Sequence, residues 1–153
     1  MKHVYYYDFP VMRFYIAESG GAITDVVTRL VEGADIKETP LILQAAEMLW
    51  EYFSGRRKYF DGLPLYFEGT EFQKKAWNAL LTIPYGETRT YKEQAEAIGN
   101  VKACRAVGAA NGKNPISIIV PCHRVIGSDG SLVGYGGGLD VKAALLELER
   151  RYS

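Results

Sequence analysis

The sequence is poor in the side chains that form disulfides and hold metal ions. Among its 153 residues there are only two cysteines and two histidines. Two cysteines cannot make a disulfide framework, so we expect an intracellular, reducing location and predict a cytoplasmic protein. A tetrahedral zinc site would need all four of these side chains. Because His3 is expected at a mobile terminus, we predict no metal site.

Long apolar runs and an excess of one charge are also absent. No segment approaches the roughly 20 apolar residues that span a bilayer. Residues 1–8 lack the apolar core and cleavage site of a signal peptide. We therefore expect no membrane partner. Eighteen basic residues balance eighteen acidic ones, so only the local distribution of charge can indicate a nucleic-acid partner.

Apolar residues, by contrast, are plentiful. They make up 48% of the chain, and tyrosine occurs eleven times. This is enough for one ordinary domain or two small ones. We predict two, an α/β amino-terminal domain over residues 1–66 and a mostly α carboxy-terminal domain over residues 67–153. The junction is placed within residues 55–69, which have no clear periodicity.

The amino-terminal domain is predicted from a hairpin and one helix. Residues 13–18 and 22–27 are rich in β-formers, and residues 19–21 between them read Ser-Gly-Gly, a hairpin signal. A helix then begins at Pro40, with Thr39 as its N-cap. The residues predicted to face inward are Leu41, Ala45, Met48, Leu49 and Tyr52.

The carboxy-terminal domain is predicted to contain a helix-turn-helix. Residues 90–93 form a capping box, in which a threonine N-cap and a glutamate three residues later satisfy each other's amides. The short helix that they start is expected to stop at Gly99. A second helix is expected to follow directly, from Asn100 or Val101 to about residues 111–112. Two short helices joined by a tight glycine turn are typical of this motif.

Two further helices of this domain are marked by apolar faces. The first is expected to end before the Pro-Tyr-Gly of residues 84–86, and a final helix is expected to be capped by Asp140. The predicted apolar positions are Phe72, Ala76, Leu80 and Ile83 in the first helix, and Val141, Ala144, Leu145 and Leu148 in the last.

Cys122 is the first candidate for chemistry. It follows residues 116–120, a β-branched run that predicts a buried strand, and stands next to His123 and Arg124. The thiolate is the reactive form of cysteine, and an adjacent base or cation promotes it. A buried structural cysteine is an equally good interpretation at this point. A cysteine hydrolase is disfavoured, because such enzymes bring the histidine from far along the chain and add an orienting Asn or Asp.

The second helix of the helix-turn-helix adds a different signal. Residues 101–110 are rich in alanine and glycine, which let a helix backbone approach a surface closely but offer little for reading base edges. Arg105 is one long cation among them. Together with Lys102, Lys113 and Arg124 it favours a phosphate-facing surface. The alternative is a tightly packed internal helix with Arg105 on its solvated side.

These features together resemble a known family. Residues 69–149 closely resemble the O6-alkylguanine-DNA alkyltransferases, or methylated-DNA–protein-cysteine methyltransferases. Residues 1–68 match only loosely, and for them the family implies a ribonuclease H-like sheet plus helix. The stretches that carry the resemblance are Gly69-Thr70-Glu71-Phe72-Gln73 with Trp77, Ile83-Pro84-Tyr85-Gly86-Glu87-Thr88, Arg105-Ala106-Val107-Gly108, Asn114-Pro115, Pro121-Cys122-His123-Arg124-Val125-Ile126 and Gly137-Gly138-Leu139.

The resemblance implies a role for each catalytic candidate. Cys122 would be the acceptor thiol, and His123 would act as its base through a bound water. Glu149 would orient the histidine, although a solvated glutamate at a helix end is the plainer interpretation. Tyr91 would donate a hydrogen bond to the guanine leaving group, although its ring could equally serve packing.

The resemblance also implies how DNA is bound. Arg105 would enter the duplex as a finger that replaces the extruded nucleotide. Asn114 would be the hinge between the second helix and the nucleophile. The family's usual serine is here Gly136, so the pocket is expected to be roomier, and Cys104 is interpreted as a packed small residue. Other predicted DNA contacts are Ala103, Ala106, Gly108, Lys102 and Arg124, and the pocket is assigned to Pro121, Val125, Tyr135, Gly136 and Gly137.

The implied activity is direct repair of DNA. The protein would transfer an alkyl group from O6-alkylguanine in duplex DNA, and in one variant of the hypothesis from O4-alkylthymine, irreversibly to its own Cys122. We expect minor-groove binding with base flipping, no cofactor, no membrane partner, and a monomer that stands alone. Two alternatives are a lesion-binding module without transfer, which the presence of Cys122 opposes, and a helix-turn-helix regulator, which the alanine-rich second helix opposes.

Overall fold

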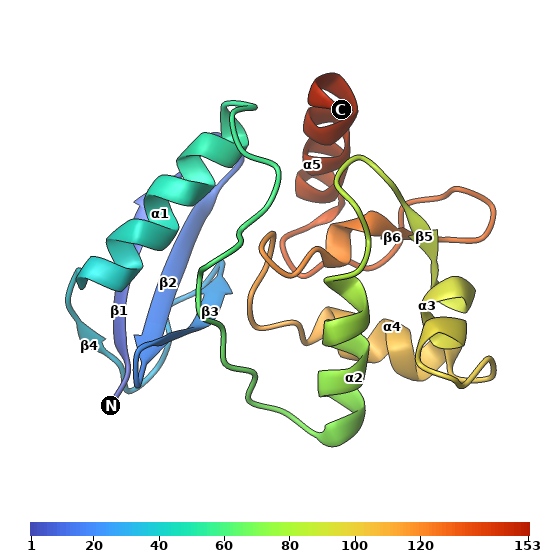
Figure 1. The fold of residues 1–153 in the computed structure, drawn as a ribbon, viewed down its shortest axis with the longest axis horizontal. Helices are drawn as coiled ribbons and strands as arrows, with labels where there is room; N and C mark the ends of the chain where they lie inside the picture. Colours follow the sequence, from blue (N-terminus) through green and yellow to red (C-terminus); the bar gives the residue numbers. More distant parts are fainter. The chain divides into compact units, whose positions relative to one another are not determined.

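The computed structural model describes residues 1–153 and divides into two compact units (Figure 1). One unit comprises Met1–Glu68 and Pro115–Ile119, and the other comprises Gly69–Asn114 and Val120–Ser153. The sequence places the junction after residue 66, whereas the first long segment ends at Glu68. The short return of the chain to the first unit was not predicted.

The first unit contains a four-stranded sheet in the order β3-β2-β1-β4. The predicted hairpin is confirmed as β2 (Arg13–Ser19) and β3 (Ala22–Val27), which pair antiparallel. Two strands were missed, β1 (His3–Asp8), antiparallel to β2, and the short β4 (Asp35–Ile36), parallel to β1. The ribonuclease H-like label stays a prediction.

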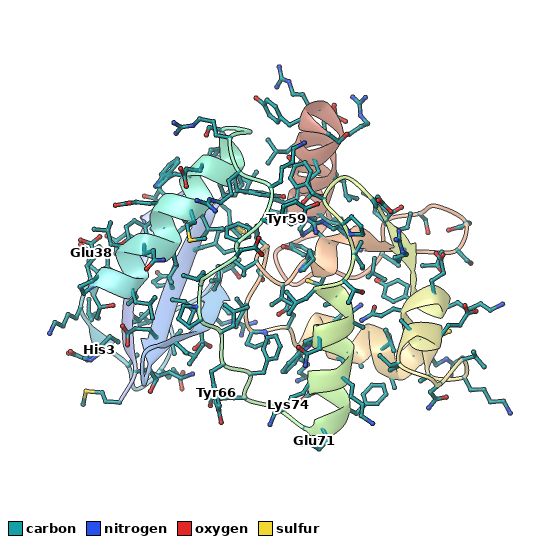
Figure 2. The ribbon with its side chains drawn as sticks, in the orientation of Figure 1. His3, Glu38, Tyr59, Tyr66, Glu71 and Lys74 are labelled. Carbon is teal, nitrogen blue, oxygen red and sulfur yellow. The ribbon has the colours of Figure 1, made fainter.

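The position predicted for His3 is wrong. Instead of lying at a mobile terminus, it is the first residue of β1 (Figure 2), and its backbone is in register with Asp35 of β4. Its Nδ1 lies 3.2 Å from Oδ2 of Asp35. The tyrosine-rich start of the chain therefore forms a strand, because both of its edges find partners.

Helix α1 (Pro40–Phe53) packs on the sheet (Figure 1). Thr39 is its N-cap, as predicted, and its side chain accepts a hydrogen bond from the Ile42 amide at 3.2 Å. Leu41, which was predicted to face inward, is only half-buried, and its neighbour Ile42 is buried instead. The buried residues of α1 are Ile42, Ala45, Ala46, Met48, Leu49, Tyr52 and Phe53.

The second unit consists mainly of four helices. Two of them begin with a capping box, formed by Thr70 and Gln73 in one and by Thr90 and Glu93 in the other. In each box the threonine side chain accepts a hydrogen bond from the amide three residues later, and the side chain of that later residue accepts one from the threonine amide. The second of these boxes was predicted and is confirmed. The elements are α2 (Glu71–Leu80), β5 (Arg89–Thr90), α3 (Tyr91–Ala97), α4 (Cys104–Gly112), β6 (Val125–Ile126) and α5 (Leu139–Tyr152).

The predicted start of the second helix of the helix-turn-helix is wrong. Helix α4 begins at Cys104 and not at Asn100 or Val101. Residues 100–103 form a turn in which the Ala103 amide donates to the carbonyl of Asn100 at 3.1 Å. No side chain caps α4, because its N-cap position is held by Ala103.

The strand predicted over residues 116–120 does not form. Only an isolated bridge joins Ile116 to Val26. Ile118 has a φ of 71°, a left-handed conformation that interrupts an extended strand and that costs a β-branched residue about 1–3 kcal/mol. Two residues after Val120 the chain forms a single 3-10 turn, η1 (Cys122–Arg124). The nucleophile candidate therefore lies on a turn.

Helices α2, α3 and α4 are joined by buried polar contacts as well as by a small apolar core. The side-chain amides of Gln94 and Asn111 donate to each other's oxygens at 2.9 and 2.7 Å, and Gln94 also donates to the carbonyl of Ala76. The indole of Trp77 donates to the carbonyl of Ala110 at 2.8 Å. These hydrogen bonds tie α4, which is built mainly from small side chains, to α2 and α3. No helix is long and apolar enough to cross a membrane.

Candidate active site

Cys122 lies in the second unit, at the start of η1, and its side chain is only 8% exposed. Its amide donates to the carbonyl of Val120 at 2.9 Å, and the same carbonyl accepts from Nδ2 of Asn114 at 2.8 Å. Burial raises the pKa of the Cys122 thiol, while a hydrogen bond from Asn114 and the charge of Lys142 act in the opposite direction. Because burial is the largest of these effects, the resting side chain is a protonated thiol that needs a base before it can react.

His123 is fully buried and is fixed by Glu149 of α5. Its Nε2 lies 2.6 Å from Oε2 of the carboxylate. An ionised carboxylate only accepts hydrogen bonds, so Nε2 carries the proton and Nδ1 is left as an acceptor. Nδ1 has no hydrogen-bond partner among the protein atoms. Burial lowers the pKa of His123, and Glu149 opposes this effect. A neutral imidazole with one open acceptor nitrogen results.

Glu149 is 1% exposed, which rules out the solvated helix-end interpretation. Its Oε1 accepts from the Gly86 amide at 3.1 Å and from Nε of Arg124 at 2.8 Å. Its Oε2 accepts from Nη2 of Arg124 at 3.0 Å, in addition to its contact with His123. Burial alone would raise the pKa of this carboxyl, yet the hydrogen bonds and charges of His123 and Arg124 hold it well below its usual range.

The position predicted for Arg124 is wrong. We grouped it with phosphate-facing residues, but the residue is only 5% exposed and its side chain is buried within the unit. Besides its two bonds to Glu149, its Nη1 donates to the carbonyl of Ile83 at 2.8 Å. A guanidinium that is held by a buried carboxylate in this way is not available to a DNA backbone.

Tyr91 and Lys142 meet at one carbonyl of the loop before α5. The Tyr91 hydroxyl and Lys142 Nζ both donate to the carbonyl of Val133 at 2.9 Å, and Lys142 also donates to that of Val125. Burial raises the pKa of Tyr91, with Cys122 acting in the same direction, so the phenol remains a hydrogen-bond donor.

Sequence reasoning missed Lys142, which is fully buried. A usable signal existed, because Lys142, Leu145 and Glu149 are spaced three and four residues apart and so share one face of a helix. The predicted apolar face of α5 is correspondingly wrong in part, since Ala144 is exposed and Leu148 only half-buried. The first turn also differs, because α5 starts at Leu139 and Asp140 lies within it.

The predicted pocket residues form two groups. Pro121 and Val125 flank η1 and are buried. Tyr135 and Gly137 are half-buried in the loop before α5, and Gly136 is exposed. A Cβ atom built on Gly136 meets no atom within 4 Å. The backbone therefore leaves space for a side chain at this position.

Helix α4 exposes one face and buries the other. Arg105 and Ala106 are exposed, and Lys102 is exposed in the preceding turn. Gly108 is half-buried, and a Cβ built there would lie 3.8 Å from the Tyr91 ring. Ala103, which we predicted as a DNA contact, is instead buried against Ala95 and Val107, with Cys104 packed at the edge of this cluster. The interpretation of Cys104 as a packed small residue is confirmed.

Comparison with known proteins places this geometry in a family. The profile described as 6-O-methylguanine DNA methyltransferase, DNA binding domain, matches residues 71–151. A methylated-DNA–protein-cysteine methyltransferase of Methanosarcina barkeri is 60% identical over 114 residues, which cover 74% of this chain and 72% of that protein. Its namesake from Mycobacterium tuberculosis is 48% identical over 155 residues, which cover 98% of this chain and 93% of the relative.

The chain belongs to the 6-O-methylguanine DNA methyltransferase family. Solved members share its fold. A crystal structure of Mycobacterium tuberculosis OGT in complex with DNA superposes with a TM-score of 0.90 at 46% sequence identity, and the match covers 99% of this chain and 94% of that one. The family resemblance inferred from the sequence is thus confirmed. No group of three or more His, Cys, Asp or Glu side chains that could hold a metal ion occurs in the structure.

The two buried groups predict that this family member loses stability in acid. The pKa of Glu149 is lowered from its ordinary value of 4.5 and that of His123 from 6.5. In both cases, as the pH falls below the ordinary value, the unfolded chain binds more protons than the folded one. The free energy of unfolding therefore becomes smaller as the pH is lowered. Urea unfolding at a series of pH values should show a decline that begins near pH 6.5 and steepens below 4.5. A flat profile would contradict the buried Glu149–His123 pair.

Proposed function

We propose that this protein repairs DNA by transferring a methyl or larger alkyl group from guanine O6 to the sulfur of Cys122, once per molecule. The observation that carries the proposal is a buried thiol beside a histidine whose Nε2 is anchored on Glu149. That arrangement occurs in a chain whose relatives are named methylated-DNA–protein-cysteine methyltransferases. Alkylated guanine in duplex DNA is the proposed substrate, and no cofactor takes part.

The proposed step is an in-line displacement at the alkyl carbon. His123 accepts the thiol proton at Nδ1 through a water molecule, and the thiolate attacks. The carbon–sulfur bond forms as the carbon–oxygen bond breaks, and the electron pair of the latter goes to guanine. Tyr91 exchanges its hydrogen bond to the Val133 carbonyl for one to the departing base. The base takes up one proton, so that the thiol proton is transferred to guanine in the net reaction. The thioether product has no simple route back.

The thiol cannot reach guanine O6 while the base is stacked in a duplex. The nucleotide must therefore be extruded, which costs a few kcal/mol. In the proposal, α4 lies along the minor groove, where its exposed small side chains allow close approach, and Arg105 fills the space that the nucleotide leaves. The base enters a pocket formed by Tyr91, Val125, Tyr135 and Gly136, while Asn114 anchors the turn that carries the nucleophile.

A mass measurement tests the proposal directly. After incubation with duplex DNA that contains one O6-methylguanine, the peptide that carries Cys122 should gain ~14 Da, the mass of a methylene. The peptide that carries Cys104 should be unchanged and serves as the internal control. Lesion binding without an adduct would instead identify a lesion-binding module, and binding to one undamaged sequence would identify a regulator.

Replacing Arg105 by alanine is expected to slow repair of duplex DNA by about tenfold or more, because extrusion loses its partner. Reaction with the free base O6-methylguanine, which needs no extrusion, should change by no more than about twofold. Second-order rates on both substrates give the comparison. Lys113→Ala is the matched control for the finger role, since it removes an exposed cation of the predicted phosphate-facing surface, just after α4, that does not enter the duplex in the proposal. Equal losses of rate on both substrates would show that Arg105 does not act by replacing the extruded nucleotide.

A further inference from the structure

Arg124 makes more hydrogen bonds to the Glu149 carboxylate than His123 does. Its Nε and Nη2 donate to the two oxygens at 2.8 and 3.0 Å, whereas His123 contacts one oxygen. The Gly86 amide adds a fourth contact. Gly86 has a φ of 80°, and a Cβ there would lie 2.8 Å from that of Ser153, so glycine is required for this approach.

The charged groups around a neutral His123 already carry an excess of positive charge, and protonation of His123 would increase that excess. The charged side chains that act on its ring are Arg124 on η1 and Glu149 and Lys142 on α5. Two neutral titratable groups face these charges in turn, Cys122 beside Lys142 and Tyr85 beside Glu149 and Arg124. Two buried cations thus already act on the ring, Arg124, which pairs with Glu149, and Lys142, while Glu149 is the one carboxylate among these groups. A proton on His123 would add a third cation to Arg124 and Lys142, with one carboxylate to compensate all three, in a site with little access to water.

We propose that Arg124 is a positioning residue that engages the charge of Glu149, so that His123 stays a neutral imidazole and passes on the thiol proton instead of keeping it. If Glu149 had His123 as its only side-chain partner, the pair would hold a proton as an ion pair, and Nδ1 would carry a hydrogen in the resting state. A base in that form could not accept the proton of Cys122. This inference rests on the proposed function for its kinetic consequence only.

The side chain at this position must be arginine for geometric reasons. The planar guanidinium reaches both carboxylate oxygens and the carbonyl of Ile83 at once, through three different nitrogens. A lysine ammonium is a single point charge and cannot repeat that fork. Arg124→Lys therefore separates the two parts of the role, since it keeps the charge and loses the fixed geometry.

Titration of His123 by NMR tests the inference without any alkyl transfer. The chain has only two histidines, and a His3→Gln variant identifies the second signal. In the otherwise unchanged protein, His123 should titrate clearly below the ordinary histidine value of 6.5. In Arg124→Gln, which removes the charge, the His123 midpoint should rise by about one pH unit or more, whereas Arg124→Lys should titrate close to the parent. A His123 that is protonated at neutral pH in the parent, or that titrates alike in all three proteins, would overturn the inference.

The rate of methyl transfer gives the second readout. In Arg124→Gln the acid limb of the rate–pH profile should move to higher pH together with the NMR midpoint, whereas in Arg124→Lys the rate should fall without that shift. Arg150→Gln is the matched control, because Arg150 is an exposed arginine that pairs with Glu147, and its profile should be unchanged. A lower rate with an unshifted profile in Arg124→Gln would leave Arg124 a packing role and overturn the inference. If no protein here transferred an alkyl group, the proposed function would fail while the NMR result would still decide the role of Arg124.

Discussion

A Cys122→Ala variant is expected to transfer no detectable alkyl group and to keep its affinity for DNA that carries the lesion. Alanine carries no nucleophilic atom. It loses the hydrogen bond from Asn114 to the sulfur, but the hydrogen bonds to the backbone of the turn remain. They run from the Cys122 amide and from Asn114 to the carbonyl of Val120. The variant loses one buried sulfur atom and retains the backbone geometry of η1. Intact-protein mass spectrometry measures the transfer, and a gel-shift titration with the same duplex measures the binding.

Cys104→Ala is the control for this experiment. Cys104 is the other free cysteine, and it is half-buried at the start of α4. Its loss should leave transfer at the parent level. An adduct that persists in Cys122→Ala and disappears in Cys104→Ala would move the acceptor to α4. Equal loss of transfer and of lesion binding in Cys122→Ala would mean that the cysteine serves the fold and not the chemistry.

The parts of the fold that sequence reasoning predicted well depend on neighbouring residues. Thr39 caps α1 through an amide three residues away, and the box at Thr90 and Glu93 closes within one helical turn. The hairpin of β2 and β3 depends on two glycines with positive φ, Gly20 and Gly21. In each case a few adjacent side chains or torsions determine the structure, so a short sequence pattern is enough to predict it.

The parts that were missed depend on partners far along the chain. Strand β1 forms because β2 and β4 pair with its two edges. Residues 116–120 have strand-forming side chains, but only the bridge from Val26 reaches them, and Ile118 turns away with a positive φ. The start of α4 shifted to Cys104 because the turn at residues 100–103 forms its own hydrogen bonds.

The candidate site was predicted mainly through the family resemblance. Spacing alone left Cys122 ambiguous and made Glu149 a solvated residue, because an isolated carboxylate on a late helical turn is usually exposed. Arg124 was wrongly placed on the surface, because a cation close to other cations in the sequence is usually exposed. The local sequence pattern could not predict that Arg124 and Glu149, 25 residues apart, form an ion pair inside the unit.

That buried pair leads to the second large effect. Glu149→Ala is expected to lower the free energy of unfolding by about 3–5 kcal/mol, because removal of one partner leaves the other charge buried and unpaired. Arg124 would keep only its bond to the carbonyl of Ile83, the Gly86 amide would lose its acceptor, and Lys142 would remain as a second buried cation. Urea denaturation at neutral pH measures the difference.

Glu147→Ala on the same helix is the matched control. Glu147 is exposed and pairs with Arg150 one turn away, and exposed pairs of this kind contribute no more than about 1 kcal/mol. Because both variants lose a glutamate from α5, the difference between their free energies of unfolding measures the effect of burying the ion pair. As the pH falls below the ordinary carboxyl value of 4.5 toward the lowered pKa of folded Glu149, the two variants should gradually converge, since Glu147→Ala progressively loses the Glu149 contribution that Glu149→Ala already lacks. Equal losses at neutral pH would mean that water reaches Glu149 in solution, and the electrostatic role inferred for Arg124 would then have no basis.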